Sequence, residues 1–480
     1  MRTQALLLVV LLLLPLAGAL ERSASGSEDL YIVFAPLSDR RGIESLERTV
    51  EQLGGEVLEE FSLLRAALVK GSRELASSLG RLGYQVSRNL ALHLTTPLQA
   101  EQPSLRHGVP NVGAPSAWAL GLNGSGVKVA VIDTGIENNH PWLMRGGKSV
   151  VAWEVDATGK GELDYCGKRT ALASAHGTHV AGIIASQDSE NRGVAPGVML
   201  YDIIAFSRDY QCIYTDEATL MRALEYALKG PDGRPGTGDE ADVINLSLGT
   251  VLPLEPLYSV MRGRGTKPAM IEALERAAAM NKVLVVAVGN VYGINLFNTL
   301  CLASGVICVG AADDARNADP RDDRLAPFSS RGPGFPATFV PHLVAPGVSI
   351  ESSVPTETGA FSFPFSGTSM ATPFVTGAAA ILVQQAKKEG AVSPREILRA
   401  LVQTARDVKG YNVTWWGQGV LPAITRSHSC QTKEQAPPEH ICGIEEGSSY
   451  RPVGARPHLL VPRFDKLVVS EQPSRQSPGA

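Results

Sequence analysis

The hydrophobic pattern divides the chain into a small N-terminal unit and a larger domain. In the small unit, period-two apolar runs alternate with residues at helical spacing, such as Ile43, Leu46, Val50 and Leu53. The predicted elements are a strand at 29–34, a helix at 43–53, a strand pair at 57–69, a helix at 75–82 and a strand at 84–94. This β-α-β-β-α-β order is that of a ferredoxin-like fold. A polar linker, 95–115, is expected to follow.

The larger domain begins near Trp118, where apolar strands alternate with helices. Near-continuous runs rich in β-branched residues occupy 127–132, 198–204, 243–246, 283–288 and 306–309. Residues 217–229 and 269–280 have helical patterns, and the apolar run 374–383 is typical of a helix buried within a domain. Such strands suit a mostly parallel sheet covered by helices on both faces. We therefore predict an α/β fold.

Both ends of the chain differ from these two units. The N-terminal pattern predicts a secretory signal peptide that is cleaved after Ala19. It consists of Arg2, a short apolar run at 5–14 and small residues before position 20. The alternative, a membrane anchor, needs about 20 apolar residues, and no segment approaches that length. The C-terminal end is rich in proline. We predict a signal peptide at 1–19, an N-terminal unit at 20–100, the larger domain at 101–427, and a Cys-bounded loop with a flexible tail at 428–480.

Composition narrows the partners and the compartment. The chain has 480 residues, 44% of them hydrophobic, and a net charge of -4, so nothing favours nucleic acid or an anionic membrane as a partner. Export makes disulfides possible. Sequence alone does not choose among the many pairings of six cysteines. Local spacing favours Cys301–Cys308 and Cys430–Cys442, which leaves Cys166 to pair with Cys212.

Three residues with catalytic potential stand at predicted strand ends and helix starts. Asp133 ends a strand, His176 opens a helix rich in small residues, and Ser369 lies at the entry of the buried helix. Singly, each has a commoner structural use: a turn, a core histidine or a helix cap. Together they have a specific one. An imidazole takes the proton of a serine hydroxyl, and a buried carboxylate orients the imidazole.

The order Asp133, His176, Ser369 is that of subtilisin. Over roughly residues 110–426 the chain resembles a secreted subtilisin-like serine protease, a subtilase. The resemblance rests on six motifs, at 131–135, 176–182, 247–249, 287–290, 328–333 and 367–373. It implies that these three residues form a catalytic triad. It also implies that Asn290 donates to the oxyanion.

The same resemblance implies a substrate pocket with two walls. The walls are Ser247, Leu248 and Gly249 on one side, and Ala287, Val288 and Gly289 on the other. Their small residues leave room for a large side chain. We expect a structural role for His179 and a structural turn at 329–331. We predict no metal or cofactor for the chemistry. The loop 186–192 offers oxygen ligands but contains Arg192, and we do not predict calcium there.

The small unit resembles the inhibitory propeptide of the family, and the alternative is an independent binding domain. We expect self-cleavage in the linker between Leu94 and His107. The leading hypothesis is a secreted, monomeric, self-processing serine endopeptidase that acts on proteins or peptides and is inhibited by its own propeptide. The alternative is a catalytically inactive secreted binding protein on the same fold.

Overall fold

The computed structural model describes residues 30–93, 98–99, 105–159, 174–206, 214–249, 267–292, 297–315, 317, 322–332, 341–390, 392–406 and 417–421. The chain divides into two compact units, residues 1–426 and 427–480. The predicted signal peptide, the C-terminal tail and four cysteines (Cys166, Cys212, Cys430 and Cys442) lie outside the described residues. The predicted domain boundaries therefore stay predictions.

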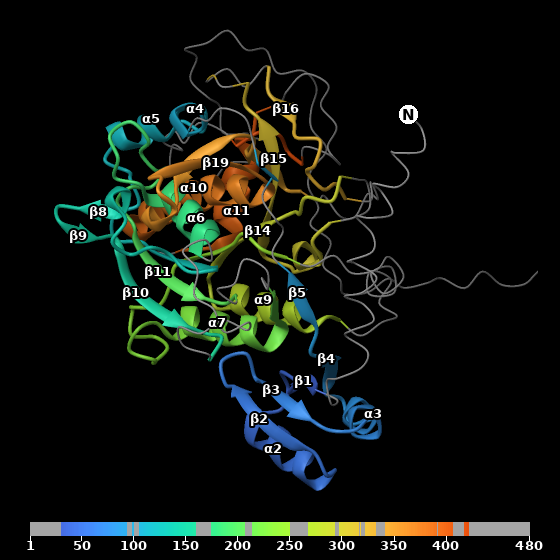
Figure 1. Ribbon diagram of the computed structural model, residues 1–480. Coiled ribbons are helices and arrows are strands. Elements are labelled where there is room, and N and C mark those ends of the chain that lie inside the picture. Colours follow the sequence, from blue (N-terminus) through green and yellow to red (C-terminus); the bar gives the residue numbers. More distant parts are fainter. Residues whose placement is uncertain are drawn as a thin grey trace, which may run out of the picture. The chain divides into compact units, whose positions relative to one another are not determined.

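The N-terminal part forms the predicted ferredoxin-like unit (Figure 1). Its sheet has the order β2-β3-β1-β4, and every neighbouring pair is antiparallel. Two helices bury Leu46, Val50, Leu75 and Leu79 in a core of their own. The elements are β1 (Leu30–Phe34), α2 (Ile43–Gln52), β2 (Glu56–Phe61), β3 (Ala66–Lys70), α3 (Arg73–Arg81) and β4 (Gln85–Arg88).

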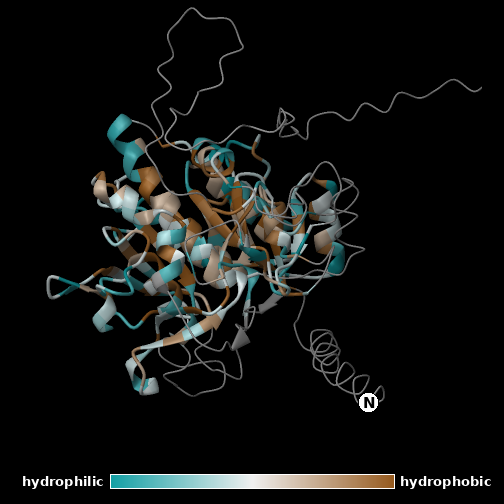
Figure 2. Cartoon of the chain, turned by 90° about the horizontal axis from the view of Figure 1, so that it is seen from above, coloured by the Kyte–Doolittle hydropathy of each residue, from teal (hydrophilic) through white to brown (hydrophobic). Residues whose placement is uncertain are grey.

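A mostly parallel sheet forms the centre of the larger domain, as predicted. Its order is β10-β11-β7-β13-β14-β15-β16, with β17 also beside β15, and only β15 and β16 run antiparallel. In Figure 2 these strands are mainly brown, the hydrophobic end of the scale. The strands are β7 (Lys128–Asp133), β10 (Val151–Asp156), β11 (Met199–Ile204), β13 (Val243–Leu246), β14 (Val283–Ala287), β15 (Val306–Asp313), β16 (Arg324–Leu325) and β17 (Leu343–Pro346).

Helices cover both faces of this sheet because successive side chains of each strand point to opposite sides. Along β7, Val129 and Val131 join one hydrophobic cluster, whereas Ala130 and Ile132 join the other. The first cluster includes α6 (Ala175–Ala185), α10 (Thr368–Glu389) and α11 (Pro394–Gln403), and the second includes α7 (Glu217–Lys229) and α9 (Ala269–Ala279).

The predicted linker is more ordered than its polar composition indicates. It contains α4 (Leu105–Asn111), and α5 (Ala114–Ala119) begins before its end. Val109 and Val112 pack into the first cluster. A Cβ on Gly108 would lie 2.6 Å from the Phe374 ring. The predicted polar linker over 95–115 therefore contains a short helix that its composition did not indicate, ordered by a few apolar contacts with α10.

The predicted strand at 84–94 is also divided. After β4 ends at Arg88, the side chain of Asn89 accepts a hydrogen bond from the Ala218 N–H. The Glu217 N–H donates to the Leu90 carbonyl, and the Leu90 N–H donates to the Glu217 carboxylate. The next residues form β5 (Ala91–His93), which pairs with β12 (Tyr214–Asp216) of the larger domain. Farther along, β6 (Leu98–Gln99) joins β19 (Ser362–Ser366), which itself pairs with β18 (Ile350–Ser353).

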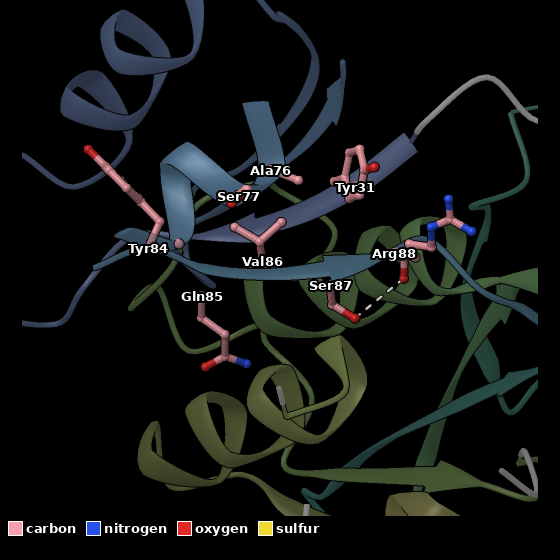
Figure 3. A pocket seen from close by; sticks show the side chains of 9 residues that line it. Tyr31, Ala76, Ser77, Tyr84, Gln85, Val86, Ser87 and Arg88 are labelled. Atoms are coloured by element: carbon pink, nitrogen blue, oxygen red, sulfur yellow. Dashed lines mark hydrogen bonds between the residues drawn. The ribbon is translucent and has the colours of Figure 1, made fainter. Parts of the chain in front are cut away.

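Smaller features complete the described chain. Short elements are η1 (Pro141–Leu143), β8 (Met144–Arg145), β9 (Lys148–Ser149), η3 (Thr299–Leu302) and η4 (Thr356–Thr358). The sulfur atoms of Cys301 and Cys308 lie at a disulfide distance of 2.04 Å, in agreement with that predicted pair. No helix among the described residues is long and apolar enough to cross a membrane. A hollow of about 470 Å³ lies beside α3 and β4, away from all of the motifs (Figure 3).

Candidate active site

Asp133 and His176 meet at the carboxyl edge of the sheet, where ligands bind in folds of this type. The Nδ1 atom of His176 donates to Oδ1 of Asp133 over 2.7 Å, and the Thr134 N–H donates to the same oxygen. Close approach requires glycine at position 177, since a Cβ there would lie 2.3 Å from the carbonyl oxygen of Gly135. The buried carboxylate thus fixes the imidazole, whose Nε2 has no hydrogen-bond partner among the described residues.

Ser369 is the second residue of α10, close to free N–H groups at the start of that helix. Its Oγ donates to the carbonyl oxygen of Ser247 over 3.0 Å, and the Ser247 hydroxyl donates back to the Ser369 carbonyl over 3.0 Å. This reciprocal pair ties the helix start to the end of β13. Helices α6 and α10 pack in the same cluster, so the three predicted triad residues stand on adjoining elements.

Asn290 lies just after β14, beyond Gly289, whose φ of 103° suits glycine. Its Oδ1 accepts hydrogen bonds from the Thr368 N–H at 2.8 Å and the Thr368 hydroxyl at 2.9 Å. These two donors fix which way the amide faces, and its Nδ2 has no partner in the described part of the chain. A Cβ on Gly367 would lie 3.2 Å from Nδ2. The free donor therefore faces the start of the serine helix.

The turn at 329–331 braces the asparagine loop. The Ser330 N–H donates to the Gly289 carbonyl over 2.9 Å, and its hydroxyl accepts from the Val291 N–H over 3.2 Å. The Ser329 hydroxyl accepts from the Ala311 N–H over 3.1 Å. These contacts agree with the expected structural turn.

The two predicted pocket walls follow neighbouring strands, since Ser247, Leu248 and Gly249 follow β13 and Ala287, Val288 and Gly289 end or follow β14. The buried side chain of Asn298 connects them. Its Nδ2 donates to the Leu248 carbonyl at 2.8 Å and to the Ala287 carbonyl at 2.7 Å. A Cβ on Gly249 would lie 2.0 Å from this nitrogen. The Asn298 amide therefore lies against both predicted walls.

Asn298 is a site residue that the sequence motifs did not mark. It stands eight positions after Asn290 and outside the six motifs. Its one local signal is its capping of η3, where Oδ1 accepts from the Leu300 N–H over 3.1 Å. Because its decisive partners lie 50 and 11 residues away in the chain, only the folded arrangement brings it between the walls.

His179 occupies a structural position, as expected. Its Nε2 donates to the carbonyls of Ile350 at 2.9 Å and Phe363 at 3.0 Å, and its ring stacks on Phe365. Burial, together with the nearby His176, lowers the pKa of His179 to about 3, so the ring is neutral near pH 7. The neutral ring holds together the β18–β19 hairpin that leads into Ser369.

No group of three or more His, Cys, Asp or Glu side chains in the described residues is arranged to hold a metal ion. In the 186–192 loop, Oδ1 of Asp188 accepts from the N–H groups of Glu190 and Asn191. That oxygen is therefore used within the turn.

Comparisons with known proteins agree with this geometry. The model of the Subtilase family matches residues 124–434. Subtilisin BL of Lederbergia lenta is 33% identical over 322 residues, which are 67% of this chain and 97% of that protein. Subtilisin E of Bacillus subtilis (strain 168) is 29% identical over 372 residues, covering 75% of this chain and 82% of that protein.

The solved structure of fervidolysin from Fervidobacterium pennivorans, a keratinolytic enzyme related to subtilisin, shares the fold. Its TM-score is 0.62 at 24% identity, and the match covers 83% of this chain and 60% of fervidolysin. Together with the family match, this likeness shows the subtilisin-like α/β fold with its mainly parallel sheet. The chain belongs to the subtilase family and is a subtilisin-like serine protease.

Proposed function

We propose that Asp133, His176 and Ser369 hydrolyse peptide bonds through an acyl-enzyme. Ser369 Oγ attacks the peptide carbonyl while Nε2 of His176 takes its proton and then gives that proton to the leaving amine. Water then attacks the ester by the same route. The observation that carries the proposal is the 2.7 Å bond between His176 and Asp133, which leaves Nε2 without a described partner.

Asn290 stabilises the oxyanion in this proposal. Its Oδ1 is held by Thr368, so Nδ2 is oriented before the substrate arrives. The backbone N–H of Ser369, at the start of α10, is the second donor. Preorganised donors of this kind stabilise charge that develops in the transition state. The alternative of an inactive binding protein has no supporting observation.

Labelling with a fluorophosphonate tests this assignment directly. The processed enzyme should form a covalent adduct at Ser369, whereas Ser369→Ala and His176→Ala should not react. A processed wild-type protein that fails to label would overturn the proposal. Labelling at another serine would overturn it as well.

We further propose that the ferredoxin-like unit is an inhibitory propeptide. Its Ile32, Phe34, Phe61 and Leu64 belong to the same hydrophobic cluster as α7 and α9. Glu225 accepts from the N–H groups of Leu63 at 2.7 Å and Leu64 at 3.3 Å, at the loop between β2 and β3.

Charged side chains of the larger domain strengthen this docking. Arg276 donates to the carbonyls of Leu64 at 2.8 Å and Ala35 at 3.2 Å, and its guanidinium lies 4.8 Å from the centre of the Phe34 ring. Arg222 forms an ion pair with Glu59. The Gln85 side chain, labelled in Figure 3, donates to the Lys267 carbonyl over 3.2 Å.

The backbone pairings of the connecting chain support self-cleavage at a narrower place than the sequence indicated. Strand β5 pairs with β12, and farther along the chain Leu98 of β6 pairs with Ser366, three residues before Ser369. The proposed bond therefore lies between Leu94 and Leu98. The N-terminal residue of the mature enzyme, determined by mass spectrometry, tests this location. A start beyond Leu98 would contradict it.

The remaining properties complete the proposal. The predicted signal peptide directs export, and the mature enzyme acts as a monomer on proteins or peptides without a cofactor for its chemistry. Asn298 shortens the pocket between the two walls, so the pocket favours short side chains before the cleaved bond.

A further inference from the structure

One acidic residue contacts elements that carry all three members of the proposed triad. Asp133 ends β7, His176 lies on α6, and Ser369 follows the β18–β19 hairpin. Glu137 belongs to the loop that leaves β7. Its backbone N–H donates to the Thr178 hydroxyl of α6 over 2.9 Å. This bond joins the aspartate loop to the histidine helix.

The side chain of Glu137 binds the turn of the hairpin. Its Oε2 accepts a hydrogen bond from the Thr356 N–H over 2.8 Å, and its Oε1 accepts one from the Thr356 hydroxyl over 2.6 Å. Thr356 begins η4, which lies between β18 and β19. Hydrogen bonds to a carboxylate are roughly twice as strong as those between neutral groups. Two such bonds from one residue also fix the direction of the carboxylate.

His140 adds a second contact from the same loop. Its Nδ1 accepts from the Trp142 N–H over 3.0 Å, so its Nε2 carries the proton and donates to the Phe361 carbonyl over 2.9 Å. Burial lowers the pKa of His140, which favours this neutral form of the ring. Phe361 directly precedes β19, and Thr356 follows β18. The loop after Asp133 therefore holds both sides of the hairpin turn.

The strands of the hairpin are held by α6 instead. In addition to the bonds from the His179 ring, the Ser352 hydroxyl donates to the His179 carbonyl over 2.8 Å. The Ser353 hydroxyl donates to the Thr178 carbonyl over 2.9 Å. A Cβ on Gly182 would collide with both hydroxyls, so helix and hairpin lie in close contact. Helix α6 thus fixes the strands, and the loop with Glu137 fixes the turn between them.

We propose that Glu137 is a positioning residue for catalysis, which aligns the hairpin, and with it Ser369, with the Asp133–His176 pair. This inference rests on the proposed function and adds a residue to it. Strand β19 ends at Ser366, three residues before Ser369, so a shift of the hairpin also shifts the nucleophile. Proton transfer needs the serine and the imidazole within hydrogen-bond reach, and a displacement of about 1 Å can cost roughly 10²-fold in rate. Glu137 itself takes no part in proton transfer.

Kinetics of the processed enzyme, expressed as the full chain, test this role. Glu137→Ala should lower kcat by roughly tenfold, within the range expected for a misplaced nucleophile. KM should change less than about twofold, because the proposed pocket walls follow β13 and β14 rather than the hairpin. The rate of self-cleavage should fall by a similar factor. All rates are measured at a temperature at which thermal unfolding shows each variant to be folded.

Two further variants separate alignment from a general loss of stability. Glu137→Gln should recover part of the lost kcat, because an amide offers one acceptor oxygen where Thr356 presents two donors. Thr356→Ala removes the hydroxyl that Glu137 accepts from. Because both changes interrupt the same contact, the doubly substituted chain should have the kcat of Glu137→Ala rather than the product of the two losses.

Glu357→Ala is the matched control. This carboxylate is exposed and directly follows Thr356, so its loss should leave kcat within about twofold. An unchanged kcat in Glu137→Ala, a loss confined to KM, or losses that multiply in the double variant would overturn the positioning role. A parent enzyme that fails to label at Ser369 with a fluorophosphonate would instead refute the proposed function on which this role rests.

Discussion

Two buried carboxylates of the larger domain, Asp133 and Asp323, differ in the groups that surround them. Asp133 ends β7 and accepts two hydrogen bonds, from His176 and from the Thr134 N–H. Asp323 precedes β16, and burial, followed by the charge of Asp314, raises the pKa of its carboxyl to about 7. Burial alone therefore does not define a role. The carboxylate with fixed partners orients an imidazole, whereas the carboxylate beside a like charge holds a proton more readily.

The largest effect expected from this contrast concerns Asp133. Asp133→Asn should lower turnover by roughly 10⁴-fold, because an amide no longer holds the imidazole in the tautomer that accepts the serine proton. Steady-state hydrolysis of a peptide substrate measures this loss. The matched Asp322→Asn change, at an exposed carboxylate, should leave turnover within about twofold. Equal turnover of the Asp133→Asn and wild-type enzymes would refute the role of Asp133.

A smaller loss is expected at Asn290. Asn290→Ala removes Nδ2 from the start of α10 and should lower turnover by roughly 10²–10³-fold, the range established for the corresponding donor in subtilisin. The Michaelis constant should change little, since the oxyanion forms only during reaction. A variant that loses substrate affinity while keeping its turnover would instead indicate a ground-state binding role.

A third carboxylate extends the comparison to the propeptide contact. Burial raises the pKa of Glu217 from 4.5 to about 7, and its carboxylate accepts weakly from the Leu90 N–H over 3.4 Å. Because Leu90 of the propeptide contacts this carboxylate, we expect proton uptake to accompany docking. The protonated Glu217 carboxyl stabilises the docked propeptide. This contribution is complete below the ordinary pKa of 4.5 and is lost as pH rises through about 7. Retention of the propeptide after self-cleavage should weaken by roughly tenfold between pH 5 and pH 8.

Glu217→Gln should flatten this pH dependence, because the amide does not titrate. Size-exclusion chromatography of the processed protein, at a series of pH values, measures how much propeptide stays bound. If the variant keeps the full pH dependence, another group is responsible and Glu217 is not the titrating residue.

The smallest effect is expected in the substrate pocket. Asn298→Ala removes the amide between Leu248 and Ala287. The ratio of kcat/KM values should shift severalfold toward peptides with larger side chains before the cleaved bond. Pocket contacts of this kind change the discrimination between substrates by roughly 1–3 kcal/mol at most. A peptide library read by mass spectrometry measures the shift. An unchanged preference would show that Asn298 does not limit the pocket.

Sequence patterns predicted the sheet, the ferredoxin-like unit and the motif residues because each depends on local order. A β-branched run that ends in Asp133, and a helix that begins near Ser369, are visible within a few positions. The amide of Asn298 was not visible, since its partners come from two other strands. The pairing of Leu98 with Ser366 was hidden for the same reason, because the two residues are far apart in the sequence.

The opposing carboxylates were also missed. Asp314 and Asp323 become neighbours only through the register of a two-residue strand, and Asn111, the amide beside Asp323, lies about 200 positions earlier in a segment predicted as a polar linker. Polar composition indicated a linker there, whereas the contacts of Val109 and Val112 order it as a helix.

The intact mass of the secreted protein tests the central claim, that Ser369 acts in a protease whose first substrate is its own chain. In a protease-deficient host, the wild-type chain should separate into a propeptide and a mature enzyme that begins between Thr95 and Leu98. The Ser369→Ala chain should keep its propeptide attached. Cleavage of the Ser369→Ala chain at the same bond, with the same yield, would contradict the claim.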